Sequence, residues 1–294
     1  VIRPSIQTNT IVSNGMKIVG DNLNFNVNFN EEVYGLGSRL QLNFSDSEKT
    51  PGATYANYQA GVGTTTFSFQ YTVPDGFIGS GDEDTDGIVL SPNFDTNGSN
   101  IIDFNGNFLI TPLVTTSFPS TFIDGIRPLI TNVTTPVPSL NTYYIGQTMA
   151  VTVNYDDNVT VTGANPYLTF AVLNVKWNPT PQLDLGSGDG TSTLIFNHTF
   201  NNGNQDNNGL TVGANIQNNS LQDVNGNFAF GVLSTTSFPT IIVDALTPTI
   251  TNSALPSIVI SNDSTYTISG TCSEFLHGET VDVVVTDRSS GTET

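Results

Sequence analysis

Hydrophobic and polar residues alternate along most of this chain. The alternation recurs in seven runs, each with an apolar side chain at every second position. The apolar positions are Leu23, Phe25, Val27 and Phe29; Leu40, Leu42 and Phe44; Phe67, Phe69, Tyr71 and Val73; Met149, Val151, Val153 and Tyr155; Leu168, Phe170 and Val172; Leu194, Phe196 and Phe200, with His198 between the last two; and Val281, Val283 and Val285. A period of two predicts strands that bury one face.

Turn signals separate these runs. The chain holds six Asn-Gly and four Asp-Gly pairs, which tolerate the positive φ of tight hairpins. No stretch shows apolar residues at the spacing of three and four that is typical of a helix, and Pro and Gly recur too often for long helices. The pattern predicts an all-β fold, with two antiparallel sheets packed as a β-sandwich in each unit.

A long internal repeat sets the domain organisation. Residues 103–132 reappear without a gap as residues 223–252, with 16 of 30 positions identical. An Ile-Arg-Pro or Leu-Thr-Pro junction begins at Ile2, Ile126 and Leu246. We therefore predict tandem units at 1–126 and 127–246 and the start of a third, truncated unit at 247–294.

Composition narrows the partners. Seven Lys and Arg residues against 26 Asp and Glu residues give a net charge of -19. Nucleic acid and anionic membrane are poor partners for such a surface, because both require clustered cations. No apolar run is long enough for a membrane span, and a single Cys, Cys272, excludes an internal disulfide framework. The acidity fits either a solvated surface or a chain that binds divalent cations.

The sharpest candidate site is the acidic loop with Asp82, Asp84 and Asp86 before Gly87. Alternate carboxylates in a loop can supply several of the hard oxygens that Ca²⁺ requires. An EF-hand is rejected, because the twelfth position is Asn93 and no helices flank the loop. The alternative is a solvated hairpin loop.

A weaker copy of this loop, with Asn204, Asp206 and Asn208, precedes Gly209. If the first copy binds Ca²⁺, we expect the metal to stabilise the chain. Fewer charges in the second copy predict a lower affinity there.

Two DxNGN segments supply further oxygens. They contain Asp103 and Asn105 in the first copy, and Asp223 and Asn225 in the second. An ordinary Asn-Gly hairpin turn is the favoured interpretation. The alternative is a metal site between units, which Asp124 or Asp244 would complete.

No constellation points to catalysis, and we expect a protein that is not an enzyme. The pairs Glu31-Glu32 and Asp156-Asp157 are adjacent in sequence, so their side chains diverge. The two His residues, His198 and His277, do not make a zinc site. His198 occupies the position of Tyr71 in the other copy, so we expect it to be a packed residue on the inward face.

The second unit carries an ordered series of motifs: YYIGQTMAVTVNYDDNVTV, GANPYL, GSGDGTSTLIF, DNNGLTV, LQDVNGNF and VDALTP. The first unit keeps most of them, as LNFNVNFNEEV, GVGTTTFSFQYTV, DTDGIVL, DFNGNF and FID. This order resembles the immunoglobulin-like repeats of large bacterial surface and secreted adhesins. The first unit departs from the pattern at VYGLGSRLQL and in an insertion around residues 51–58.

The resemblance implies tandem immunoglobulin-like modules that form an extended rod, on the order of 100 Å long for two and a half modules. It implies a stalk or fibre at a bacterial cell surface or outside the cell. The expected partners are other modules of the same chain and a host or cell-surface glycan or protein. The alternative is a glycan-binding module attached to a secreted polysaccharide-degrading enzyme. Its candidate stacking residues are Trp177, Tyr167, Tyr55 and Tyr58.

Overall fold

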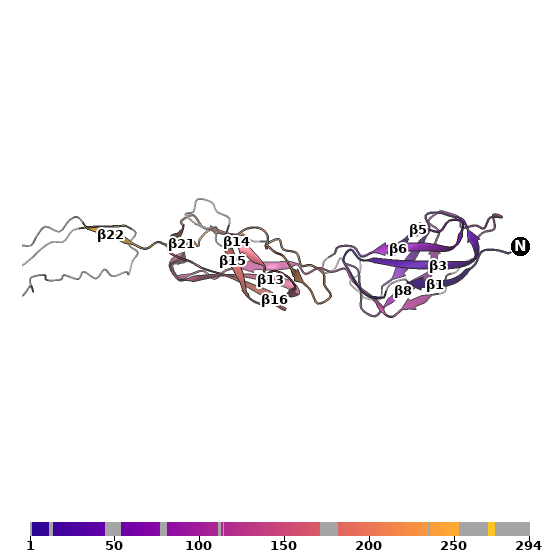
Figure 1. The fold of residues 1–294 in the computed structure, drawn as a ribbon, viewed down its shortest axis with the longest axis horizontal. Coiled ribbons are helices and arrows are strands. Elements are labelled where there is room, and N and C mark those ends of the chain that lie inside the picture. Colours follow the sequence, from indigo (N-terminus) through magenta and orange to yellow (C-terminus); the bar gives the residue numbers. More distant parts are fainter. Residues whose placement is uncertain are drawn as a thin grey trace, which may run out of the picture.

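The computed structural model describes residues 2–11, 14–44, 54–76, 81–110, 113, 115–170, 182–234, 236–252 and 270–273. Within these residues the regular structure is β, apart from one short 3-10 turn at Ser139–Asn141. Nearly all strand pairs are antiparallel, as the alternating pattern predicts. Figure 1 shows two strand-rich bodies that follow one another along the long axis of the view.

The first body contains two sheets. Seven strands form the larger one, in the order β1 (Ile6–Ile11), β3 (Asn22–Val33), β6 (Thr64–Thr72), β5 (Thr54–Ala60), β4 (Arg39–Asn43), β8 (Ile88–Asp95) and β9 (Thr116–Phe118). The smaller sheet has the order β2 (Gly15–Ile18), β10 (Thr121–Asp124) and β7 (Glu83–Asp84). In it β2 and β10 run parallel, so an early strand lies against the closing strand.

The second body repeats this topology. Its larger sheet has the order β11 (Ile130–Thr134), β13 (Thr148–Val161), β16 (Thr191–Thr199), β15 (Gln182–Ser187) and β14 (Tyr167–Thr169), and β19 (Leu221–Gln222) also pairs with β13. The smaller sheet has β12 (Thr142–Tyr143), β21 (Ile242–Ala245) and β17 (Asn204–Asp206), again with a parallel first pair. A further pair is β18 (Leu210–Thr211) with β20 (Ser237–Phe238). Five strands of the larger sheet and all three of the smaller one therefore recur in the same order, whereas β18 and β20 form a separate pair in place of β8 and β9. This arrangement is compatible with two β-sandwiches.

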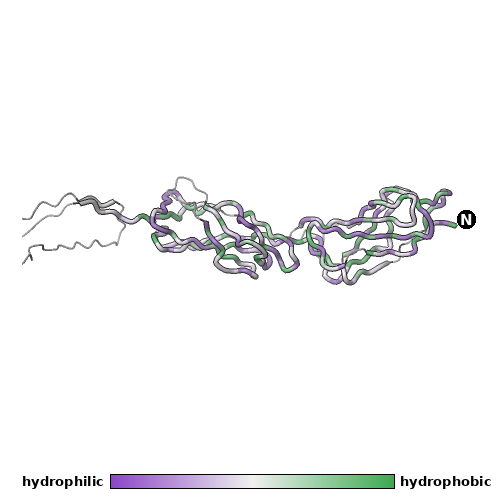
Figure 2. The backbone as a smooth tube through the Cα atoms, in the orientation of Figure 1, coloured by the Kyte–Doolittle hydropathy of each residue, from purple (hydrophilic) through white to green (hydrophobic). Residues whose placement is uncertain are grey.

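Each body has its own hydrophobic core. One cluster of buried side chains runs from Leu23 to Ile123 and the other from Ile130 to Ala245. The alternating positions predicted to face inward on β3, β6 and β13 are buried, and Figure 2 shows hydrophobic and hydrophilic stretches interleaved along both bodies. Burial of this apolar surface is the main source of stability for such sheets.

Tyr71 and His198 occupy equivalent positions, as predicted. Tyr71 lies opposite Leu23 on β3, and His198 lies opposite Met149 on β13. The Tyr71 hydroxyl donates a short hydrogen bond to the Asp82 carboxylate. His198 is half-buried, and its ring packs edge-on against Phe170 and Phe200.

Tyr71 and His198 have different hydrogen-bond partners in the two bodies. His198 Nδ1 lies 2.9 Å from the carbonyl oxygen of Gln182 on the neighbouring strand β15. The Tyr71 phenol thus bonds to a carboxylate in the first body, whereas the His198 imidazole contacts a backbone carbonyl in the second. Burial lowers the pKa of His198, so the neutral ring is favoured there.

Little of the expected third unit is described. β22 (Thr249–Asn252) pairs antiparallel with β23 (Gly270–Ser273), which places Cys272 opposite Ile250. The predicted strand at Val281, Val283 and Val285 and the residue His277 lie outside the described residues, so the third unit stays a prediction.

No helix in the described part of the chain has the length and hydrophobicity that crossing a membrane would require.

Candidate functional site: the junction between the two bodies

The acidic loop of the first body directs its carboxylates to separate partners. Asp82 and Asp84 are buried, at 3% and 0% exposure, whereas Asp86 is exposed. Asp82 accepts the Tyr71 hydroxyl, and Asp84 Oδ1 accepts the backbone N–H of Gly87 at 2.7 Å. The structure therefore gives two of the three predicted calcium ligands roles inside the fold.

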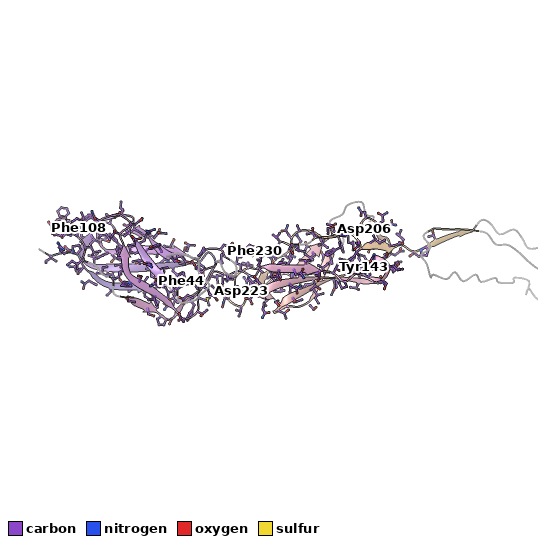
Figure 3. All side chains as sticks on the ribbon, turned by 180° about the vertical axis from the view of Figure 1, so that it is seen from behind. Phe44, Phe108, Tyr143, Asp206, Asp223 and Phe230 are labelled. Carbon is purple, nitrogen blue, oxygen red and sulfur yellow. The ribbon has the colours of Figure 1, made fainter. Side chains whose placement is uncertain are left out.

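The corresponding loop of the second body is similar. Asp206 is buried, and its Oδ1 accepts the backbone N–H of Asn208 at 3.0 Å. Burial raises the pKa of Asp206, while backbone hydrogen bonds from Asn208 and Gly209 partly oppose that rise. Figure 3 places Asp206 at the end of the second body that is remote from the first.

Both DxNGN segments form the tight turn that their sequence predicts. Asp103 Oδ1 accepts the backbone N–H groups of Asn105 and Asn107, each at 2.8 Å. Asp223 Oδ1 accepts the equivalent N–H groups of Asn225 and Asn227, each at 2.9 Å. The glycine of each Asn-Gly pair has a positive φ, 82° at Gly106 and 107° at Gly226. An Asp side chain thus ties each loop internally, independent of any neighbour.

The second of these loops, which we call the docking loop (residues 223–227), contacts the end of the first body. Asn225 Nδ2 donates to Asp124 Oδ2 at 2.7 Å, and Asn227 Nδ2 donates to the Asp124 carbonyl at 3.1 Å. Asn227 Oδ1 accepts the backbone N–H of Val19 at 2.9 Å. Figure 3 shows Asp223 where the two bodies meet. Two Asn side chains therefore fix the second body to β10 and to the chain after β2.

The connecting segment, residues 125–128, is itself held from both sides. Arg127 ion-pairs with Asp75 at 2.9 Å on the first body. Its Nε donates to the Phe228 carbonyl at 2.6 Å on the second, and its guanidinium lies 4.8 Å from the centre of the Phe230 ring. Backbone hydrogen bonds join Arg127 to Gly76 and Phe230 to Pro128. The connecting segment is therefore hydrogen-bonded to both bodies rather than running free between them.

A cleft of about 280 Å³ lies beside this contact. It is lined by residues of both bodies: Glu83, Asp124, Ile126, Pro128, Asp156, Asp157, Asp223 and Asn225. Five of these eight residues are acidic, so negative charge concentrates at the point where the bodies meet. The Asp156 side chain is held in place by a hydrogen bond, because its Oδ1 accepts the Leu129 N–H at 2.7 Å.

Asp124 is the central carboxylate of the cleft. It is 8% exposed, and its Oδ1 accepts the Ile126 N–H at 3.1 Å. Burial raises the pKa of Asp124, and the negative charges of Asp223 and Asp157 raise it further. Hydrogen bonds from Asn225 and Ile126 oppose that rise. A cation in the cleft would relieve this repulsion.

The carboxylates of the cleft are not arranged as ligands of one ion. Across the described ranges, no three His, Cys, Asp or Glu side chains form a group that could hold a metal ion as they stand. The metal role proposed for Asp103, Asn105, Asp223 and Asn225 therefore stays a prediction, as does that for the Asp82–Asp86 loop. Of the two predicted partners of a site between units, Asp124 lies at the junction with Asp223 and Asn225, and Asp244 lies on β21 of the second body.

The candidate glycan-stacking residues are spread over the chain. Tyr55 lies under the Arg39 guanidinium, 4.1 Å from its ring centre. Tyr58 packs edge-on against Phe67, and its hydroxyl accepts the Val62 N–H at 3.0 Å. Tyr167 pairs with Asp184 in the other body, and Trp177 lies outside the described residues. The two tyrosines of the first body therefore serve packing and turn contacts.

The repeated Ile-Arg-Pro at Ile2 and Ile126 places Arg127 in the junction from the sequence alone, but sequence reasoning did not find its partner Asp75 or the contact at Val19. Val19 contributes only a backbone N–H, which leaves no trace in the identity of its side chain.

No protein-family model and no curated protein matches the chain.

Proposed function

We propose that this chain is a non-catalytic structural and adhesive segment of a bacterial cell-surface or secreted protein. In this proposal immunoglobulin-like modules at 1–126, 127–246 and from 247 onward follow one another as a stalk. The observation that carries the proposal is the junction, where both faces and the connecting segment are hydrogen-bonded. A stalk needs modules that keep their relative orientation, whereas mobile domains are joined by exposed linkers with few contacts.

Three features support a stiff connection. Residues 125–128 bond to both bodies, Pro128 restricts φ, and the docking loop adds contacts away from the connection. Gly125 lets the chain pass close to the Asp82 carbonyl, since a Cβ at this position would lie 2.8 Å from that oxygen. This close contact holds the start of the connecting segment against the first body.

We further propose that Ca²⁺ strengthens the junction by binding in the acidic cleft. A divalent cation would neutralise part of the charge on Asp124, Asp157 and Asp223, which repel one another when no cation is bound. Ca²⁺ accepts carboxylate and amide oxygens in flexible geometry, which suits a cleft whose exposed Asp157 can move. The residues would have to shift toward one centre, because they do not converge as they stand.

Distance measurements across the junction test both parts. Spin labels are placed at Thr72 on β6 and at Asn158 on β13, which are exposed positions on the two bodies. Cys272→Ser removes the native cysteine so that only these two positions are labelled. A stalk predicts one narrow distance distribution, and a broad distribution would refute the proposed function.

Calcium is tested in the same labelled chain, first in EDTA and then in millimolar CaCl₂. Ca²⁺ should narrow the distance distribution and raise the melting temperature. Both effects are expected because Ca²⁺ would bind only when the two bodies are folded and docked, and so would stabilise that state. Asp157→Asn should abolish the response, while the equivalent change in the first body, Glu31→Gln, should leave it intact. Identical distributions and melting temperatures in both buffers would remove calcium from the account and leave the stalk.

A further inference from the structure

The first body presents, at its opening end, a loop of the same kind as the docking loop. In residues 103–107 the Asp103 side chain makes the same internal hydrogen bonds as Asp223 does in residues 223–227. Figure 3 shows Phe108, which follows the first loop, at the end of the first body remote from Asp223. One body therefore carries a docking-type loop at its opening end and accepts such a loop at its closing end.

The two loops differ in burial. Asn227 is 1% exposed and Gly226 is half-buried, whereas Asn107 is half-buried and Gly106 is exposed. Asn107 Nδ2 approaches the Ile2 carbonyl at 3.4 Å, a longer contact than the one that Asn227 makes to Asp124. The difference lies in the residues that dock, since the turns themselves are the same.

The segment leading into the first body is also built for such a contact. Arg3-Pro4 corresponds to Arg127-Pro128, and the Ile110 N–H donates to the Pro4 carbonyl at 2.9 Å as the Phe230 N–H does to Pro128. Ser5 N–H donates to Asn30 Oδ1 at 2.7 Å, as Leu129 N–H does to Asp156 Oδ1. Arg3 is exposed, whereas Arg127 is half-buried in its ion pair with Asp75.

We propose that residues 103–107 and Arg3 form a preformed docking face that takes the closing end of another module of this kind. A second copy of the first body supplies all the required groups: the Val19 N–H, the Asp124 oxygens, the Gly76 carbonyl and the Asp75 carboxylate. The two ends of the first body are thus complementary and form a head-to-tail interface. A head-to-tail interface extends as a series unless its rotation closes a ring. This inference rests on the proposed stalk function and specifies which face takes the next module.

The contact is small, so it requires a covalent connection that raises the effective concentration of the two faces. The sequence supplies a suitable one, because the closing Asp124-Gly125 is followed by Ile-Arg-Pro and the chain opens on the same tripeptide at Ile2. Residues 1–125 placed directly before residues 2–294 therefore recreate the native junction sequence.

The test is a distance measurement in this duplicated chain with Cys272→Ser. Labels at Thr72 of the leading copy and Glu32 of the following copy span the new junction. Glu32 is exposed and is equivalent to Asn158, so the pair matches the Thr72–Asn158 pair of the native junction. We expect the two pairs to give the same mean distance and width.

Asn107→Ala together with Arg3→Ala in the following copy should broaden the new distribution and leave the native one unchanged. A broad distribution at the new junction beside a narrow native one would overturn this inference and leave the proposed function standing. Broad distributions at both would refute the proposed function as well. The native pair, measured in the same duplicated chain, reports that the bodies are folded.

Discussion

The loops at residues 103–107 and 223–227 share the DxNGN pattern and the same internal turn, yet only the second lies against another body. In both, an Asp accepts the backbone N–H groups of the two Asn residues that follow it in the motif. Only Asn227 also bonds to Asp124 and Val19 on another body. The motif therefore builds a rigid turn by itself, and its role in assembly depends on what is placed opposite it.

The charge environment differs in the same way. Hydrogen bonds, chiefly from the Asn107 side chain, lower the pKa of Asp103. At the junction the buried carboxylate is Asp124, whose pKa burial raises. The isolated loop thus favours its ionised Asp, and the docked loop faces an Asp for which ionisation is costly. Variants at equivalent positions can separate the stability of the turn from the stability of the junction.

The largest difference is expected between Asn227→Ala and Asn107→Ala. Removing the Asn227 amide leaves the part-buried Val19 N–H and the Asp124 carbonyl without these partners, which costs about 2–3 kcal/mol. Asn107→Ala loses contacts to Asp103 in a more exposed loop and should cost about 1 kcal/mol or less. Hydrogen exchange followed in β10 for Asn227→Ala, and at the Tyr34–Ile102 backbone pair beside residues 103–107 for Asn107→Ala, measures the two effects. Equal losses would mean that the Asn acts only within its own turn.

Next in size is Arg127→Ala, with Arg3→Ala as its matched control. Arg127 loses a hydrogen bond to the Phe228 carbonyl and an ion pair that is partly exposed, so we expect a loss of about 1–2 kcal/mol. Arg3→Ala should change the free energy of unfolding by less than about 0.5 kcal/mol, as exposed substitutions usually do. Calorimetric unfolding of each variant provides the measurement. A loss at Arg3 as large as at Arg127 would contradict the assignment of Arg127 to the junction.

Asp124→Asn should have a smaller, pH-dependent effect. Because the folded-state pKa of Asp124 is raised, the folded chain binds its proton more tightly than the unfolded chain does. Wild-type stability therefore falls as pH rises from the ordinary Asp pKa through the raised one. The Asn variant does not ionise at this position, so its stability should not fall in this way. In EDTA its melting temperature should exceed that of wild type by a difference that grows as pH rises from the ordinary Asp pKa through the raised one. Melting curves from pH 4 to pH 8 check the sign, and a margin that shrinks with rising pH would contradict it.

The smallest effect is expected for His198→Tyr, which makes the second body like the first at the Tyr71 position. The side chain is half-buried between Phe170 and Phe200, and the equivalent position of the first body holds a tyrosine, so the larger phenol ring should cost only about 1 kcal/mol, the low end for added volume. Tyr71→Phe should cost more, because Asp82 is buried and loses its phenol donor. Denaturant midpoints of both variants compare them, and a larger loss at His198 would show that the two positions are not equivalent.

The strands could be predicted from the sequence because burial on one face of a sheet enforces a period of two. The inward-facing residues of β3, β6 and β13 are examples. The Asn-Gly pairs predict tight turns, and the positive φ at Gly106 and Gly226 confirms them. The DxNGN segments were identified as turns with a possible role between units. What they contact could not be read from the pattern.

The roles of the acidic loop and of the junction could not be predicted from the sequence, because they depend on contacts between residues far apart in the chain. The alternation of Asp82, Asp84 and Asp86 favours a cation site, but only Glu83 and Asp84 of this loop lie on a strand, β7, and the chain bends directly after it, so the three carboxylates do not share one face. Asp82 and Asp84 are accordingly held by Tyr71 and by the Gly87 N–H. The junction depends on backbone groups of Val19, Gly76 and Phe228, and the identity of a side chain does not specify such groups.

Small-angle X-ray scattering of the full 294-residue chain tests the central claim most directly, because it measures the arrangement of the bodies rather than any one contact. Modules docked end to end predict a particle on the order of 100 Å in maximum dimension, from strands of about 3.3 Å per residue plus loops. Asn227→Ala with Arg127→Ala should change this profile, and Asn107→Ala with Arg3→Ala should not. A compact particle of roughly 60 Å for the wild-type chain would contradict the account, since the same strands would then pack side by side.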